Sequence, residues 1–312
     1  MLKILLRKQL YELNSSLFYD SKKGKTRSKA SAVLLIVLYA LLMVVVIGGI
    51  FTCLAVSICK PFVGMGLDWL YFDIMTLMAL FLGVFGSVFN TYSSLYKAKD
   101  NDLMLSLPIP TKYVLISRLT GVYLMGLMFS AVVMLPTVIV YFVIAQPAFS
   151  GVVGALLLTV LVSVFVFILS CLLGWVVAKI SVRLKSKSLI IVILSLVFFG
   201  LYYFVCFNAY ELLQELIVNA LTVGDKIMDS AYVLYIIGDC GRGGVLSMLY
   251  VTLAVGILFI ITYRILARNF IKIATTSDRA ARREYRAQTA KMRSASSALL
   301  HRELSRFLAS PT

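Results

Sequence analysis

The chain has 312 residues, of which 61% are hydrophobic and 14% are charged, and its formal net charge at pH 7 is +16. Its mean hydropathy of +0.96 lies far above that of an ordinary water-soluble domain. These values exclude a soluble globular protein and indicate an integral membrane protein.

The first 30 residues are predicted to form a cytoplasmic segment. Leu2–Leu13 has the pattern of a basic amphipathic helix lying at the membrane surface, and a basic linker follows it. Residues 24–26 read GKT, but a phosphate-binding loop also needs a glycine at position 19, which is Tyr19. The linker is therefore predicted to contact membrane lipids and not nucleotide.

Six apolar runs form the predicted transmembrane domain, residues 31–268. Each meets or approaches the length of about 20 residues that a membrane-spanning helix needs. They lack the alternation of barrel strands, and lipid offers no hydrogen-bonding partner to an exposed backbone, so we expect an all-α, polytopic fold. The runs are 32–59, 69–93, 116–145, 152–178, 189–207 and 245–266.

Basic residues are concentrated on one predicted side of the membrane. Of the 30 Lys and Arg residues, 27 lie in the first 30 residues, in 94–118, in 179–188 and from Arg264 onward. The positive-inside rule then places both termini in the cytoplasm, as six spans require. This distribution explains the net charge without a nucleic-acid partner.

The outer segment between the fifth and sixth spans contains two candidate amphipathic helices, Ala209–Leu221 and Ala231–Ile237. They are either short helices that dip into the membrane or parts of a plain outer loop. Residues 269–312 are predicted to form a cytoplasmic charged linker, with a helix over Asp278–Arg293. In that tail Leu300–Leu304 repeats the residue character of Leu6–Leu10.

The predicted loop between the second and third spans carries the candidate functional site. Asp100 is a good N-cap for about two helical turns, which Pro108 ends, and Thr111 can cap the third span. The helix would place Leu103, Met104 and Leu107 on one apolar face. This face either docks a cytosolic partner or packs against the inner ends of the spans. The candidate residues are Lys99, Asp100, Asn101, Asp102, Leu103, Met104, Leu105, Ser106, Leu107 and Pro108.

No catalytic, cofactor or metal site is predicted. His301 is the single histidine, and the five cysteines lack metal-ligand spacing. Asp73 lies near the outer end of the second span, and Arg118 opens the third. The absence of ionisable residues at mid-membrane disfavours an ion-coupled secondary carrier.

The stretch KDNDLMLSLPIPTKYVLISRL, Lys99–Leu119, resembles the (D)xxLLxSLPIxxxxxxxSR stretch of bacterial type 2 ABC exporter permeases. The resemblance implies a permease of the bacterial cytoplasmic membrane that is not itself an enzyme and is powered by a cytosolic ATPase docked at this loop. It also implies an N-terminal elbow helix and re-entrant outer helices. The chain would then be the first six-span half of a longer permease, or a half that dimerises. The alternatives are a secondary carrier or channel, and a membrane scaffold or sensor.

Overall fold

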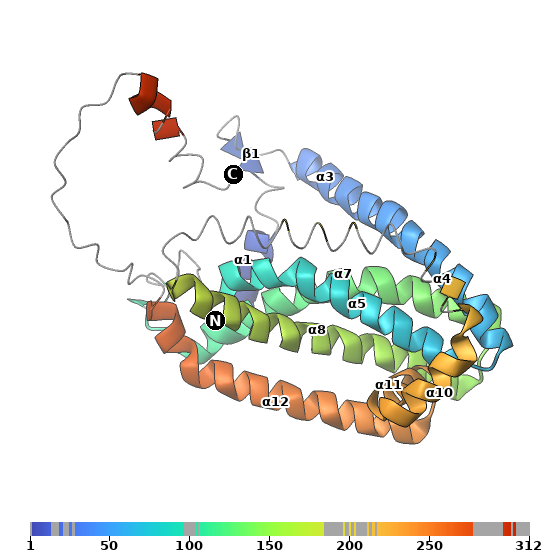
Figure 1. Ribbon diagram of the computed structural model, residues 1–312. Coiled ribbons are helices and arrows are strands. Elements are labelled where there is room, and N and C mark those ends of the chain that lie inside the picture. Colours follow the sequence, from blue (N-terminus) through green and yellow to red (C-terminus); the bar gives the residue numbers. More distant parts are fainter. Residues whose placement is uncertain are drawn as a thin grey trace.

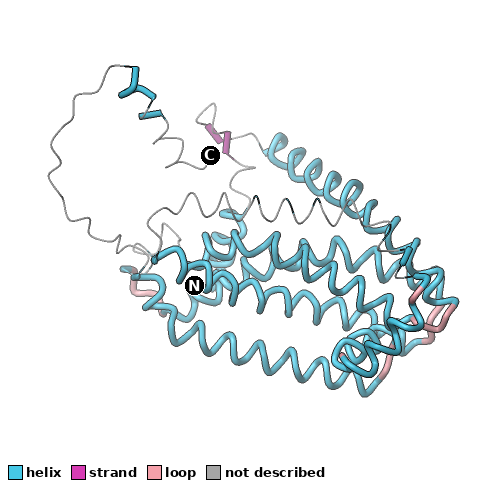
Figure 2. Tube along the Cα trace, in the orientation of Figure 1, coloured by secondary structure: helices cyan, strands magenta, loops and turns pink. Residues whose placement is uncertain are grey.

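A computed structural model shows long helices that lie side by side as a bundle (Figure 1). Its described residues are almost all helical, and short loops join the helices at the two ends of the bundle (Figure 2). The structure describes residues 2–13, 19–20, 25–26, 29–96, 104, 106–183, 196, 200, 203, 211, 214–215, 217–276, 296–300 and 302–303.

The described elements confirm the all-α, polytopic fold. In chain order they are α1 (Leu2–Leu13), β1 (Tyr19–Asp20), β2 (Lys25–Thr26), α3 (Lys29–Leu42), the π-helix η1 (Met43–Ile47), α4 (Gly48–Gly64), α5 (Asp68–Thr91), the π-helix η2 (Tyr92–Tyr96), α7 (Thr111–Ala145), α8 (Phe149–Arg183), α10 (Ala220–Ser230), α11 (Tyr232–Arg242) and α12 (Val245–Thr276).

Five helical stretches in the described ranges are long and apolar enough to cross a membrane, and they match five of the six predicted spans. Of the sixth, 189–207, the structure describes only Leu196, Gly200 and Tyr203, all helical. The rest of that span lies outside the described residues, as does the predicted helix Asp278–Arg293. The five stretches are Val44–Gly64, Asp68–Val88, Thr111–Ala145, Phe149–Val177 and Val245–Arg268.

Two predicted features of the N-terminal half take a different form. The first span is divided, since the π-helical turn η1 separates α4 from α3, which stands away from the other helices (Figure 1). In the basic linker, β1 and β2 form a short antiparallel pair with Tyr19 opposite Thr26. The described residues of the GKT segment, Lys25 and Thr26, are thus strand residues.

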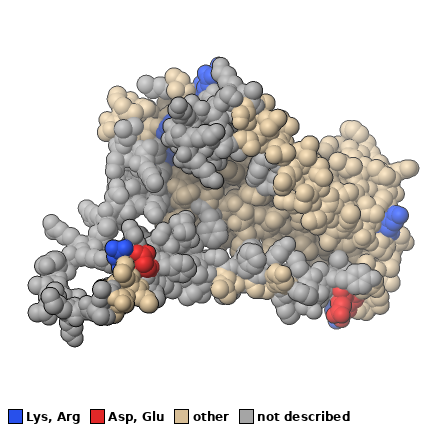
Figure 3. Space-filling view, turned by 90° about the horizontal axis from the view of Figure 1, so that it is seen from above, with Lys and Arg blue, Asp and Glu red and all other residues tan. Residues whose placement is uncertain are grey.

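The core lies between α5, α7 and α8. Trp69, Tyr71 and Phe72 of α5 are almost completely buried. The Tyr71 hydroxyl donates a hydrogen bond of 2.9 Å to the carbonyl oxygen of Thr137 on α7. Such bonds matter in lipid, where apolar side chains gain nothing from leaving water and helices associate through packing and hydrogen bonds. On the face in Figure 3, charged side chains lie at the margins of the wide tan surface, and its middle is uncharged, as lipid contact requires.

The two short helices α10 and α11 pack at the end of the bundle where α5 and α8 begin (Figure 1). In the predicted piece Ala209–Leu221 the described residues are helical except for a turn at Asn219, after which α10 begins. α11 extends the predicted Ala231–Ile237 piece to Arg242 and packs against α5, α8 and α12. The described part is therefore helical, with α11 packed between spans and α10 packed against α11.

Close backbone approach holds α11 in this position. A Cβ atom at Gly238 of α11 would collide with the backbone carbonyl of Trp69 on α5. On the other side, a Cβ atom at Gly154 of α8 would collide with the carbonyl oxygen of Cys240. Burial raises the pKa of the Cys240 thiol to about 12, and neighbouring Asp239 adds to this shift. The thiol is therefore an uncharged packing group.

We expect Gly238→Ala to destabilise the protein by roughly 1–3 kcal/mol, because a methyl group there meets backbone that cannot move aside. The matched control is Gly256→Ala on α12, where a Cβ atom would meet nothing within 4 Å. The control should be neutral or stabilising by up to about 1 kcal/mol, since alanine favours a helix. Thermal unfolding in detergent measures both. Equal effects of the two substitutions would contradict the close docking of α11.

Candidate functional site

The predicted site loop lies at the end of the bundle opposite α10 and α11, where α5 ends and α7 begins (Figure 1). Four of its ten candidate residues are described: Met104, Ser106, Leu107 and Pro108. The other six, which are Lys99, Asp100, Asn101, Asp102, Leu103 and Leu105, lie outside the described residues.

Helical conformation in the loop ends before Pro108. Met104 and Ser106 are helical, whereas Leu107 and Pro108 form a bend. A proline disfavours helical backbone at the residue before it, which explains the change at Leu107. The third span then begins at Thr111, earlier than predicted, with Pro110 at the N-cap and no side-chain cap. The expected capping by Thr111 is therefore not observed.

The two described residues of the predicted apolar face have different surroundings. Met104 is 8% exposed and lies in a small crevice with Leu5 of α1 and Val114 of α7, whereas Leu107 is 44% exposed. Because the helix ends between them, Leu107 does not lie on the same helical face as Met104. Met104 therefore joins the loop to the bundle, and Leu107 remains accessible.

A hydrogen-bonded junction lies beside Met104. Its centre is Ser94 of η2, at the end of the second span. The Gln9 side chain on α1 donates a bond of 3.3 Å to the Ser94 hydroxyl, and Arg118 on α7 donates one of 2.9 Å to the Ser94 carbonyl oxygen. Arg118 is 4% exposed, two turns inside α7. The junction therefore ties α1, η2 and α7 together next to the loop.

Sequence reasoning found only part of this junction. Arg118 was noted as a charge at the start of a span, but the spacing of residues gave no indication of its partner. Gln9 lies within the predicted amphipathic helix Leu2–Leu13, and no sequence pattern predicted a partner for it. The available signal was an arginine next to a long apolar run. If such an arginine is buried it requires nearby acceptors, because an unpaired buried charge is very costly.

Asp73 is the second ionisable residue inside a span. It is 4% exposed, and the backbone N–H of Gly238 faces its carboxylate, although neither oxygen is in good hydrogen-bond geometry. It lies beside Gly238, where α11 meets α5. Asp73 and Arg118 thus lie near opposite ends of the bundle, and within the five described spans no Asp, Glu, Lys, Arg or His side chain lies at mid-depth.

No group of three or more His, Cys, Asp and Glu side chains in the described part of the chain could hold a metal ion. The sequence-based expectation that the protein uses no metal or cofactor stays a prediction.

Residues 35–307 match the family model described as "Membrane protein of 12 TMs". The chain belongs to this family. No curated protein and no solved structure matches it. Membership of the 12-TM family agrees with the multi-span fold, and the described part of this member contributes the five spans given above.

In this 12-TM family member, we expect Arg118→Met to lower the thermal unfolding midpoint. The variant loses a charged hydrogen bond to Ser94, which corresponds to roughly 1.5–3 kcal/mol. The matched control is Arg268→Met on α12, an exposed site that should change stability by less than about 0.5 kcal/mol. A melting curve for Arg118→Met that coincides with that of the control would show that the junction contributes no stability.

Proposed function

We propose that the chain is the membrane-spanning permease of an ATP-driven ABC exporter, powered by a separate cytosolic ATPase. One observation carries the proposal. The loop between the second and third spans buries Met104 against the Ser94 junction and leaves Leu107 and Pro108 exposed. A force applied to the exposed part would therefore reach α1 and two spans together. The sequence resemblance of Lys99–Leu119 to type 2 permeases supports the same role.

In this proposal the ATPase supplies the energy for transport, and the chain forms the path of the substrate across the membrane. ATP binding would close the ATPase dimer, and the loop would pass that movement to the spans as a rigid-body change that alternates access between the two sides. A second six-span half, fused or contributed by a second copy, would complete the path. The chain would lie in a bacterial cytoplasmic membrane with both termini inside, and it would not be an enzyme.

Asp73 favours a second candidate function, an ion-coupled secondary carrier. Intramembrane carboxylates in such carriers bind the coupling ion, and this one is buried with only the backbone N–H of Gly238 facing it. The two candidates separate readily, because transport by the carrier would need no ATPase and would be lost in Asp73→Asn. A scaffold or sensor would show no transport at all.

The docking role predicts that Leu103→Asp combined with Leu107→Asp abolishes ATPase binding. Placing two charges in an apolar interface costs at least a few kcal/mol, which corresponds to a loss of affinity of about 100-fold or more. The matched control is Leu221→Asp, an exposed leucine of α10 at the opposite end of the bundle. Co-purification of the ATPase and the yield of membrane-inserted protein are measured together.

Normal insertion with full ATPase binding would refute the docking role. Failed insertion of the double variant alone would show that these leucines pack against the spans.

The proposed orientation predicts opposite labelling of two introduced cysteines. In a variant that carries Cys53→Ser, which removes the exposed cysteine of the described residues, and Cys206→Ser, at a position outside them, an impermeant thiol reagent applied to intact cells should label Lys226→Cys but not Leu107→Cys. Both positions are exposed and lie at opposite ends of the bundle. Permeabilised cells, in which both should react, provide the control. Labelling of Leu107→Cys alone in intact cells would reverse the orientation.

A further inference from the structure

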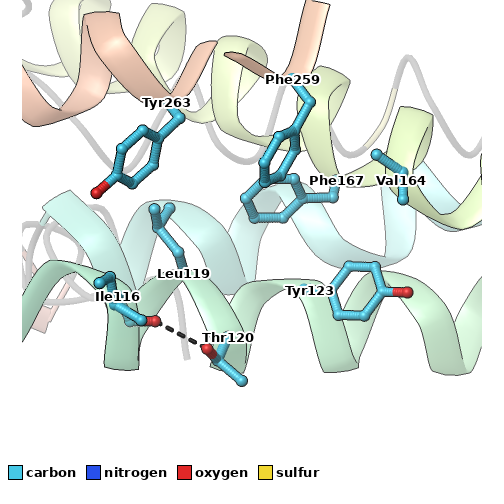
Figure 4. A pocket seen from close by; sticks show the side chains of 8 residues that line it. All are labelled: Ile116, Leu119, Thr120, Tyr123, Val164, Phe167, Phe259 and Tyr263. Atoms are coloured by element: carbon cyan, nitrogen blue, oxygen red, sulfur yellow. Dashed lines mark hydrogen bonds between the residues drawn. The ribbon is translucent and has the colours of Figure 1, made fainter. Parts of the chain in front are cut away.

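A cavity of about 470 Å³ lies between α7, α8 and α12, at the same end of the bundle as the site loop but on another face of α7. Figure 4 shows side chains from all three helices around it, among them Thr120 and Tyr123 of α7, Phe167 of α8, and Phe259 and Tyr263 of α12. The ring centroids of Tyr123 and Phe167 lie 6.1 Å apart, and those of Phe167 and Phe259 lie 6.0 Å apart. The volume lies in the range of roughly 300–1,000 Å³ that is typical of sites for small ligands.

The lining favours a hydrocarbon ligand over a polar one. Two of its hydroxyl groups already have partners inside the protein: the Thr120 hydroxyl donates a bond of 2.9 Å to the carbonyl oxygen of Ile116, and the Tyr123 hydroxyl lies 3.2 Å from that of Ser163. A polar solute would lose its hydration and gain few hydrogen bonds in return. An acyl chain loses nothing on entry, because the surrounding bilayer is equally apolar.

Charge lies at one end of this cavity. Lys112 precedes Ile116 by four residues on α7, in line with Thr120 and Tyr123, and Arg264 follows Tyr263 on α12. Both basic side chains are exposed. Long basic side chains near the end of a span reach toward the lipid head groups. α7, α8 and α12 contain no Asp or Glu residue, so these helices contribute no charge that would repel a phosphate.

We propose that this cavity binds one acyl chain of an anionic phospholipid from the adjoining leaflet, with the phosphate held at Lys112 and Arg264. The cavity opens between spans, where acyl chains surround the protein, and its basic end lies where the head groups of that leaflet lie. This inference rests on the membrane-spanning fold and is independent of the proposed ATPase. Its failure would therefore leave the proposed function untouched.

The test uses the full chain in nanodiscs that contain a trace of photoreactive phosphatidylglycerol, with a diazirine in the middle of one acyl chain. Cross-linked peptides are identified by mass spectrometry. We expect labels on the α7, α8 and α12 peptides that line the cavity. The yield should exceed that of the matching phosphatidylcholine probe by at least about fivefold, because each basic side chain near the surface attracts an anionic lipid by about 1 kcal/mol.

The head-group contact is tested by Lys112→Gln combined with Arg264→Gln, which should remove the preference for the anionic probe. The matched control is Lys60→Gln combined with Lys226→Gln, two exposed lysines at the opposite end of the bundle, which should retain it. If both double variants keep the same preference, Lys112 and Arg264 do not hold the phosphate and the proposal is wrong.

The acyl-chain site is tested by filling the cavity with Thr120→Trp, which should remove cavity labelling. The control is Ile139→Trp, at a 60% exposed position on the same helix, which should leave it unchanged. If Thr120→Trp does not fold, Val164→Phe fills the cavity from α8 and carries the same expectation. Labels spread evenly over the exposed apolar surface of the spans would show ordinary surrounding lipid only and would overturn the proposal.

Discussion

Contact between backbones at glycine positions is the constraint on which this bundle depends. Inside a bilayer, an apolar side chain gains nothing by leaving lipid for protein, so helices associate through close packing and hydrogen bonds. Gly238 and Gly154 let α11 approach α5 on one side and α8 on the other. With α11 held in this way, α5, α8 and α12 have a common partner at one end of the bundle.

The opposite end of the bundle has different contacts. α12 packs mainly against α8 and makes few contacts with α7, and the cavity lined by Tyr123, Phe167 and Phe259 lies between these three helices. On another face of α7, the same end holds the junction of Ser94 with Gln9 and Arg118. One end of the bundle is thus held by close backbone packing, and the other includes a hydrogen-bonded junction.

The sequence predicts those features that depend on one helix alone, such as the position of a span. The span Phe149–Val177 was expected at 152–178, because hydrocarbon requires a long apolar helix whatever its neighbours are. What depends on two helices was predicted less well. Met104 and Leu107 have the spacing of one helical face, but the helix ends between them and only Met104 is buried. The cavity could not be predicted, because it depends on which faces of α7, α8 and α12 meet.

The π-helical turn η2 sets the direction in which Ser94 faces at the end of the second span. A π-helix has hydrogen bonds from each residue to the fifth one along, so it holds one residue more in its turn than an α-helix does. Removing one residue before Ser94 in this turn would restore α-helical winding and rotate Ser94 by about 100°. Ser94 would then no longer face Arg118 on α7. The attachment of α1 and α7 to the end of the second span therefore depends on the length of one helical turn.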